Sequence, residues 1–195
     1  MIRPAAGCCL ALLVAGCTSL PPSGDAINWP ARRTELQIMD RWSLDGRVAI
    51  ARGTEGFSGG LSWRQDGAHA DIEIRGPLGG TALSIEVDGA RMSVADGRGA
   101  SLDGDAALEF LTSELGAPLP VGQLRFWLVG VSAPDAPQLE SIGTDGRLAT
   151  LEQLGWRVRY LRYQSVSGIA LPARMEIESE GMRMRLAIAN WTLAP

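Results

Sequence analysis

Apolar residues recur at every second position over most of this chain, and no other feature restricts its fold as strongly. The alternation runs from Trp42 to Val94 and returns from Leu148 to Ala189, interrupted by turns such as Asp66-Gly67 and Asp88-Gly89. A period of two places successive side chains on opposite faces of a strand, and short glycine-bearing turns join antiparallel neighbours. The sequence therefore predicts a meander of antiparallel strands with one apolar and one solvated face.

Three segments depart from this period and predict helices. The first runs from Trp29 to Ile38 with Pro30 in its first turn; the second follows Asp105 as its N-cap; the third opens at Pro120. The residues expected on their buried sides are Leu36 and Ile38, then Leu108, Leu111 and Leu115, then Leu124, Trp127 and Leu128.

The predicted fold is mainly β with α. About nine strands need a cover on their apolar face, and these helices are the segments able to supply it. We therefore expect an open, unclosed antiparallel β-barrel, or strongly curved sheet, with about three helices packed in its concave side. Such a sheet can leave a cavity. Its expected walls are the inward residues of four neighbouring strands, Val48, Ile50, Leu61, Trp63, Ile72, Ile74, Leu83 and Ile85.

One turn of the meander, Gly76–Gly80, carries an apolar residue, Leu78, at its tip. Glycine and proline suit the turn for backbone reasons, but they do not explain a leucine there. Two interpretations stay open: Leu78 folds back onto the sheet, or it projects as a small apolar probe suited to lipid.

The N-terminal segment predicts a lipid anchor. Its apolar run of about ten residues, 5–14, is as long as a signal-peptide core and too short to span a bilayer. The small residues Ala15 and Gly16 then precede Cys17, which resembles the bacterial lipobox. We expect cleavage between Gly16 and Cys17, with S-diacylglycerol and N-acyl groups on Cys17; an ordinary secretory signal is the alternative. Thr18, in place of aspartate, favours the outer membrane by resemblance to the bacterial sorting rule.

Composition excludes several function classes. The 18 basic and 22 acidic residues give a net charge of −4, without the basic stripe typical of nucleic-acid binding. The cysteines are Cys8, Cys9 and Cys17, so the expected processing leaves no free thiol for a disulfide, a zinc site or a nucleophile. The chain has no lysine, which excludes Schiff-base chemistry.

No catalytic constellation emerges either. Gly56–Gly60 matches G-x-S-x-G around Ser58, but a nucleophile elbow needs a strand, a turn and a helix, and both flanks here predict strands. The single histidine, His69, lacks a second histidine for a metal triad. We expect no enzyme activity, no metal and no cofactor.

Short motifs then follow one another in a distinctive order along nearly the whole chain. They are the lipobox, Trp42 with Gly46-Arg47-Val48-Ala49, Leu61-Ser62-Trp63, Gly76-Pro77-Leu78-Gly79, Leu119-Pro120, Trp127-Leu128-Val129-Gly130, Asp145-Gly146, Gly155-Trp156 with Tyr160, Leu171-Pro172 and Trp191. Each motif is weakly specific, but in this order and spacing the chain resembles the LolB family of outer-membrane lipoprotein receptors.

The resemblance implies an open antiparallel barrel with internal helices and a hydrophobic cavity. It implies that the chain accepts lipoproteins from the periplasmic carrier LolA, binds their acyl chains and inserts them into outer-membrane lipid. It also implies that Pro77, Leu78 and Gly79 form a loop associated with membrane insertion. The expected organisation is a signal peptide (1–16), a lipidated Cys17 with a flexible linker (17–28), and one periplasm-facing, monomeric domain (29–195).

Two other functions stay open. One is an outer-membrane lipoprotein that transfers nothing and serves as an assembly factor or scaffold. The other is a lipid-processing hydrolase built on Ser58. An apolar cavity favours transfer, a packed core favours the scaffold, and a buried serine, histidine and acid would favour the hydrolase.

Overall fold

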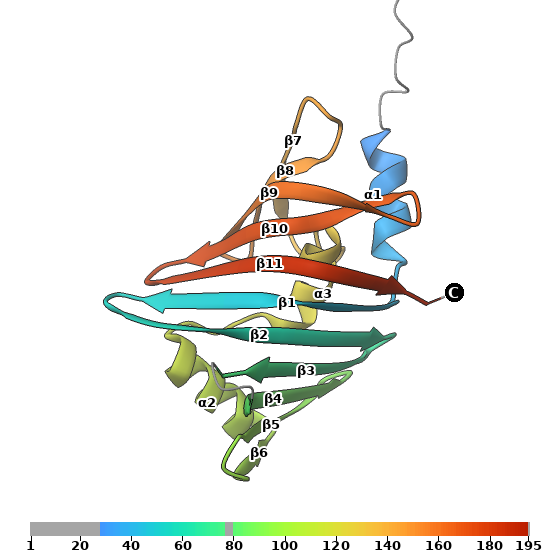
Figure 1. Cartoon of the computed structure of the whole chain (residues 1–195). Helices are drawn as coiled ribbons and strands as arrows, with labels where there is room; N and C mark the ends of the chain where they lie inside the picture. The colour runs from blue at the N-terminus through green and yellow to red at the C-terminus, as the bar shows by residue number, and fades with distance from the viewer. Residues whose placement is uncertain (1–27, 77–79, 195) are drawn as a thin grey trace, which may run out of the picture.

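The structure, a computed structural model, describes residues 28–76 and 80–194. Within these residues eleven strands form one antiparallel sheet in the order β6-β5-β4-β3-β2-β1-β11-β10-β9-β8-β7 (Figure 1). The strands are β1 (Arg41–Arg52), β2 (Glu55–Asp66), β3 (His69–Arg75), β4 (Thr81–Asp88), β5 (Arg91–Asp96), β6 (Ser101–Asp103), β7 (Gln138–Ile142), β8 (Leu148–Gln153), β9 (Trp156–Val166), β10 (Ile169–Ser179) and β11 (Met182–Leu193). The helices are α1 (Trp29–Gln37), α2 (Asp105–Leu115) and α3 (Val121–Val129).

The sheet is an unclosed barrel wall, as the alternation predicted. Strands β1–β6 form one half and β7–β11 the other, and the pairing of β1 with β11 joins the two halves at the centre. The short strands β6 and β7 are the two edges. Both α2 and α3 come between β6 and β7 in sequence and lie on one side of the sheet (Figure 1). Their placement confirms that helices cover the apolar face.

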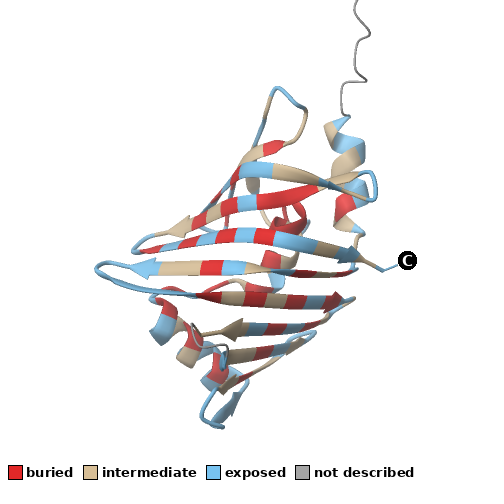
Figure 2. Cartoon of the chain, viewed as in Figure 1, coloured by how far each residue is buried: buried red, intermediate tan, exposed pale blue. Residues whose placement is uncertain are grey.

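The burial of the side chains follows the period of two. In β11, Met182, Met184, Leu186 and Ile188 are buried, and the residues between them are exposed. Figure 2 shows the same alternation of buried and exposed residues along the central strands. One face of each strand therefore contributes to the core and the other faces solvent.

β-Bulges interrupt two of the pairings between central strands. One lies between β1 and β11 at Gly46, where a Cβ atom would lie 2.3 Å from the Ala187 carbonyl oxygen, so only glycine fits. The other pairing, between β9 and β10, shifts register on both sides of Arg174, once beside Pro172, which has no N–H for the ladder. Bulges bend and twist strands, so both contribute to the curvature of the sheet.

Helix α1 lies across the end of the sheet and is attached through polar contacts. Arg32 donates a hydrogen bond to the Ala170 carbonyl at 2.5 Å, and Gln37 donates to the Ser132 carbonyl at 3.0 Å. Glu140 of β7 accepts from Trp29 at 2.8 Å and pairs with Arg33. These contacts connect α1, which follows the expected linker, to β7, to β10 and to the loop before β7.

The helix boundaries are close to the predicted ones, with three corrections. Ile38 is 74% exposed and Leu108 is 44% exposed, so neither lies on the buried side of its helix. Asp105 is the first helical residue, and the N-cap is Gly104, which has no side chain to accept a hydrogen bond. Helices α2 and α3 end at Gly116 and Gly130, and both glycines adopt the left-handed conformation that closes a helix.

Two strands were not predicted from the sequence. All three residues of β6 are exposed, so its sequence carries no alternation. In β7 the large apolar residue Leu139 is 71% exposed, and no residue of this strand is fully buried. Both are edge strands formed by backbone pairing with a neighbour, which a hydropathy pattern does not record.

Candidate functional site

The inward side chains of β1–β4 converge on one apolar cavity beneath α2 and α3. All eight residues proposed as its walls line this one space: Val48, Ile50, Leu61, Trp63, Ile72, Ile74, Leu83 and Ile85. Their strands are hydrogen-bonded neighbours, and the register places Leu61 beside Ile74 and Ile72 beside Ile85. The alternation and the order of the strands together bring these residues to one place.

The helices and the second half of the sheet complete the enclosure. Sequence reasoning did not assign these residues to the cavity: Leu111, Leu115, Leu119, Val121, Leu124, Leu128, Ile177, Met184 and Leu186. Helical spacing had already placed Leu111, Leu115, Leu124 and Leu128 on buried faces. The missing information was that β10 and β11 pair next to β1, which puts Ile177, Met184 and Leu186 opposite the helices.

The cavity is apolar and small. Every residue that lines it is apolar, and its volume is about 50 Å³. A space for one water needs only about 10–15 Å³, so this cavity has room for a few methyl-sized groups. A lipid chain would enter only if α2, α3 or the strands moved apart.

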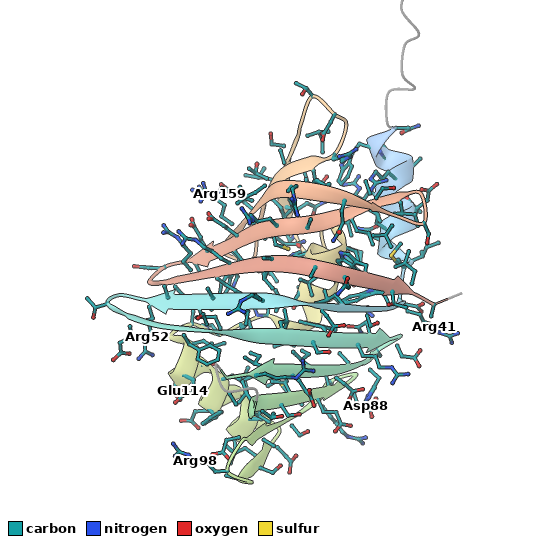
Figure 3. The ribbon with its side chains drawn as sticks, in the orientation of Figure 1. Arg41, Arg52, Asp88, Arg98, Glu114 and Arg159 are labelled. Carbon is teal, nitrogen blue, oxygen red and sulfur yellow. The ribbon has the colours of Figure 1, made fainter. Side chains whose placement is uncertain are left out.

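A larger hollow leads away from the cavity at the end of the sheet that carries α2. This hollow, called the mouth below, has a volume of about 770 Å³ and shares Ile50, Ile74, Leu83 and Leu115 with the cavity. Its rim is mixed: Phe57 and Phe110 supply apolar surface. The charged members of the rim are Arg52, Glu55, Asp96, Arg98 and Glu114. Figure 3 shows Arg52, Glu114 and Arg98 at this end, with Arg41 and Asp88 at the opposite end.

Arg52 connects the sheet to the helix that covers the cavity. From the last position of β1 its Nη1 donates to the Ser113 carbonyl of α2 at 2.7 Å, and its Nη2 pairs with Glu55 at 3.3 Å. The stem of Arg52 also packs on the C-cap of α2, where a Cβ at Gly116 would lie 2.3 Å from its Cδ. Arg52 thus positions the C-terminal end of α2 at the mouth.

A buried polar contact fixes α3 on the other side of the cavity. The Tyr160 hydroxyl of β9 donates to the Trp127 carbonyl at 2.9 Å, and Trp127 donates through Nε1 to Gln153 at 2.8 Å. Burial raises the pKa of Tyr160 well above its ordinary value, so this hydroxyl keeps its proton and remains a donor. The side of α3 away from the cavity is therefore held by directional bonds.

Three other predicted site elements cannot be located in this structure. Gly16 and Cys17, the expected cleavage and lipidation site, lie outside the described residues, as do Pro77, Leu78 and Gly79. The two neighbours of that loop, Gly76 and Gly80, are joined by a backbone hydrogen bond of 2.9 Å. The roles of Cys17 and Leu78 stay predictions.

The serine and histidine considered for hydrolysis lie far apart. Ser58 is an exposed residue inside β2, so its motif is not a strand–turn–helix elbow. His69 pairs with Asp66 at the other end of the same strand, about 26 Å away at 3.3 Å per residue. Ser58 and His69 therefore cannot exchange a proton.

His69 belongs instead to an exposed group on the outer face. Its imidazole, Asp71 and Glu86 place their ligand atoms within 4.8 Å of one another. The imidazole already contacts Asp71 at 3.3 Å. In residues 28–76 and 80–194, no helix is long and apolar enough to cross a membrane.

Comparisons with known proteins agree with this geometry. The family described as "Outer membrane lipoprotein LolB" matches residues 40–191. The protein named "Outer-membrane lipoprotein LolB" from Stutzerimonas stutzeri is 36% identical over 191 residues, covering 94% of this chain and 92% of the relative. The protein of that name from Nitrosococcus oceani is 36% identical over 187 residues, covering 93% of each chain.

Solved structures show the same fold at low identity. A LolA superfamily protein from Nitrosomonas europaea aligns with a TM-score of 0.53 and 14% identity over 87% of this chain and 94% of that one. A DUF1329 family protein from Desulfovibrio piger aligns with a TM-score of 0.57 and 12% identity over 85% and 90%. The extent of the family match and the identity of the relatives lead to one conclusion: this chain belongs to the LolB family of outer-membrane lipoproteins.

Proposed function

We propose that this protein is an outer-membrane-anchored receptor that accepts lipoproteins from a LolA-type carrier and inserts them into the outer membrane. The observation that carries the proposal is the cavity lined by apolar residues alone beneath two helices, in a chain of the LolB family. Acyl chains leaving water for such a space gain about 25 cal/mol for each Å² of apolar surface buried.

We propose the following organisation around that domain. Residues 1–16 are a signal peptide, Cys17 carries the diacylglycerol and the N-acyl group, and 17–28 form the linker. Two or more acyl chains anchor a protein firmly, whereas one gives only marginal binding. The domain, 29–195, would then face the periplasm, and Pro77, Leu78 and Gly79 would contact the membrane during insertion.

Transfer of this kind needs no covalent chemistry. The cargo moves downhill if the cavity binds acyl chains better than the carrier does, because a binder with equal affinity for two states shifts nothing. The mouth is the proposed route, since it is the wider hollow and shares four lining residues with the cavity.

The small volume of the cavity supports one alternative. A space of about 50 Å³ is close to a packed core, which is what a scaffold or assembly factor without cargo would have. The two functions differ in whether the helices separate from the sheet when an acyl chain is offered.

The test uses the mature protein and a carrier loaded with lipoprotein, and follows the cargo from one to the other. Ile74 is half-buried and lies where the mouth meets the cavity, so Ile74→Glu places a carboxylate at this junction. We expect cargo uptake to fall at least tenfold, because a buried unpaired charge opposes entry of an acyl chain.

Ser58→Glu is the matched control, since it adds the same group to the outer face of the neighbouring strand. Uptake by this variant should equal that of the unsubstituted protein. If no cargo reaches the unsubstituted protein, or if Ile74→Glu receives it normally, the transfer function is wrong and the scaffold is favoured.

A further inference from the structure

The outer, solvent-facing side of the sheet carries an uneven distribution of charge. The chain has a net charge of −4, yet arginines predominate on the outer face of β1 and β9–β11. Apart from Arg41, which pairs with Asp66 at the start of β1, the exposed arginines there are Arg47, Arg157, Arg159, Arg162, Arg174, Arg183 and Arg185. The carboxylates among them are Asp45, Glu152, Glu176 and Glu178. Figure 3 marks this region by Arg159.

Four of these arginines form ion pairs with three of the carboxylates. Glu176 accepts from Arg159 and, at 3.2 Å, from Arg185. Glu178 contacts Arg183 at 2.6 Å and Arg159 at 3.4 Å, while Glu152 pairs with Arg157 at 2.8 Å.

The other three form what we call the arginine row: Arg47, Arg174 and Arg162. Arg174 lies directly opposite Arg162, and Ala187 separates it from Arg47 on the other side. Among the described residues, no ion pair of this face includes any of the three. Like charges directly opposite each other on a sheet destabilise it, so the row opposes folding unless an anion covers it.

A β-bulge adds an apolar residue at the same place. Tyr160 pairs with Met175 and Arg162 with Arg174, which leaves Leu161 as the extra residue of β9. Leu161 is 52% exposed, and its neighbour Arg162 is exposed as well, whereas Tyr160 is buried. The bulge therefore breaks the alternation and directs a leucine and an arginine to the same outer face.

We propose that the arginine row and Leu161 form a second membrane-contact surface that binds the phosphate groups of anionic phospholipids. Guanidinium groups bind phosphate oxygens in pairs of parallel hydrogen bonds, and an exposed leucine among them can enter the interface. An acidic protein fits less well. Protein interfaces use large aromatic anchors in a patch of about 800 Å² per partner, and Leu161 is the one large exposed apolar residue described on the outer face of β9–β11.

The proposed anchor makes the contact geometrically possible, so this inference rests on that anchor. The linker 18–28 reaches at most about 36 Å from Cys17. Helix α1 touches β10 at Ala170, four residues and about 13 Å along the strand from Arg174. Tethering gives a high local concentration of lipid. A gain in lipid affinity of about fivefold per arginine is therefore enough to orient the domain.

The experiment uses the lipidated protein in vesicles and a polarity-sensitive fluorophore on Leu161→Cys. The mature chain would have no other free thiol, and labelling of the protein without this substitution measures any free Cys17. We expect blue-shifted emission with vesicles of phosphatidylcholine and phosphatidylglycerol, and a smaller shift with phosphatidylcholine alone. The shift should decrease as the salt concentration rises.

Two charge-matched double substitutions in the labelled protein separate the row from net charge. Arg162→Gln with Arg174→Gln should abolish the anionic-lipid shift. Arg64→Gln with Arg91→Gln removes the same charge from the outer face of the other half and should preserve it. A second label position, Asp88→Cys at the far end of β4, should show no shift.

Equal shifts at both label positions, or equal losses in both double variants, would overturn the proposal. A shift produced by the loaded carrier and not by lipid would assign the surface to an acidic protein instead, and would also overturn it. Cargo uptake is not part of these readouts. The receptor function and the membrane surface can therefore fail independently.

Discussion

At the scale of single residues, the structure shows where the chain accepts strain. Leu154 occupies the first position of the two-residue turn between β8 and β9 with φ +55°, and Gly155 follows with φ +77°. Both residues of such a turn need positive φ, which Asn-Gly satisfies with little cost. A leucine in the left-handed region costs roughly 1–2 kcal/mol, and Leu154 is 49% exposed, so core packing does not compensate fully.

Leu154→Asn should therefore stabilise the protein by about 1 kcal/mol. For a chain of this size the gain corresponds to a rise in Tm of about 2–4 °C, measured by thermal unfolding followed by circular dichroism. Leu139→Asn is the control, because it also replaces an exposed leucine at this end of the sheet but changes no strained backbone. Equal changes in both variants would mean that removal of exposed apolar surface, not relief of strain, is responsible.

At the scale of elements, α2 is the cover of the cavity most open to displacement. It packs through Ala107, Leu111 and Leu115, and its C-terminal end is positioned by Arg52. A cation that donates to the last carbonyls of a helix also interacts favourably with the helix dipole. Weakening this contact should release α2 locally without unfolding the sheet.

We expect Arg52→Gln to lower the free energy of unfolding by no more than about 1 kcal/mol, because the contact is solvent-exposed. Amide hydrogen exchange in α2 should quicken several-fold, and an apolar dye should enter the cavity faster. Arg41→Gln, which removes an exposed pair with Asp66 at the opposite end, should leave both rates unchanged. Unchanged exchange in Arg52→Gln would show that α2 is held by its apolar face alone.

At the scale of the whole molecule, the sequence predicted the curved sheet, the three helices and one wall of the cavity. It did so because the alternation of residues such as Leu61 and Ile72 directly encodes which side chains face inward. It could not place Ile177 and Met184 in the same cavity, since that depends on β11 pairing with β1 across about 140 residues of sequence. Nor does any local pattern predict the exposed edge strand β7 or the bulge that turns Leu161 outward.

Alkaline pH tests the assembled core, because few groups in this protein titrate there. The chain has no lysine, arginine stays protonated, and the two tyrosines, Tyr160 and Tyr163, are both half-buried or buried. Burial raises the pKa of each above the ordinary 10.0, and for Tyr163 this effect exceeds the opposing one of Arg32. The unfolded chain therefore loses these protons at a lower pH than the folded one.

The sign of the linkage follows. Below pH 10 both states are protonated and the tyrosines leave stability independent of pH; above it the unfolded state is favoured by up to roughly 1.4 kcal/mol per pH unit for each tyrosine. Tyrosinate absorbance and circular dichroism should then change together above pH 10. Tyr160→Phe should cost about 1 kcal/mol at neutral pH, because it removes one of the two hydrogen bonds that the Trp127 carbonyl accepts, the other coming from the Gly130 N–H. It should also halve the alkaline slope. Tyrosinate that forms near pH 10 with the circular dichroism unchanged would mean that solvent reaches both hydroxyls in the folded protein, and that the core between α3 and β9 opens more easily than this structure shows.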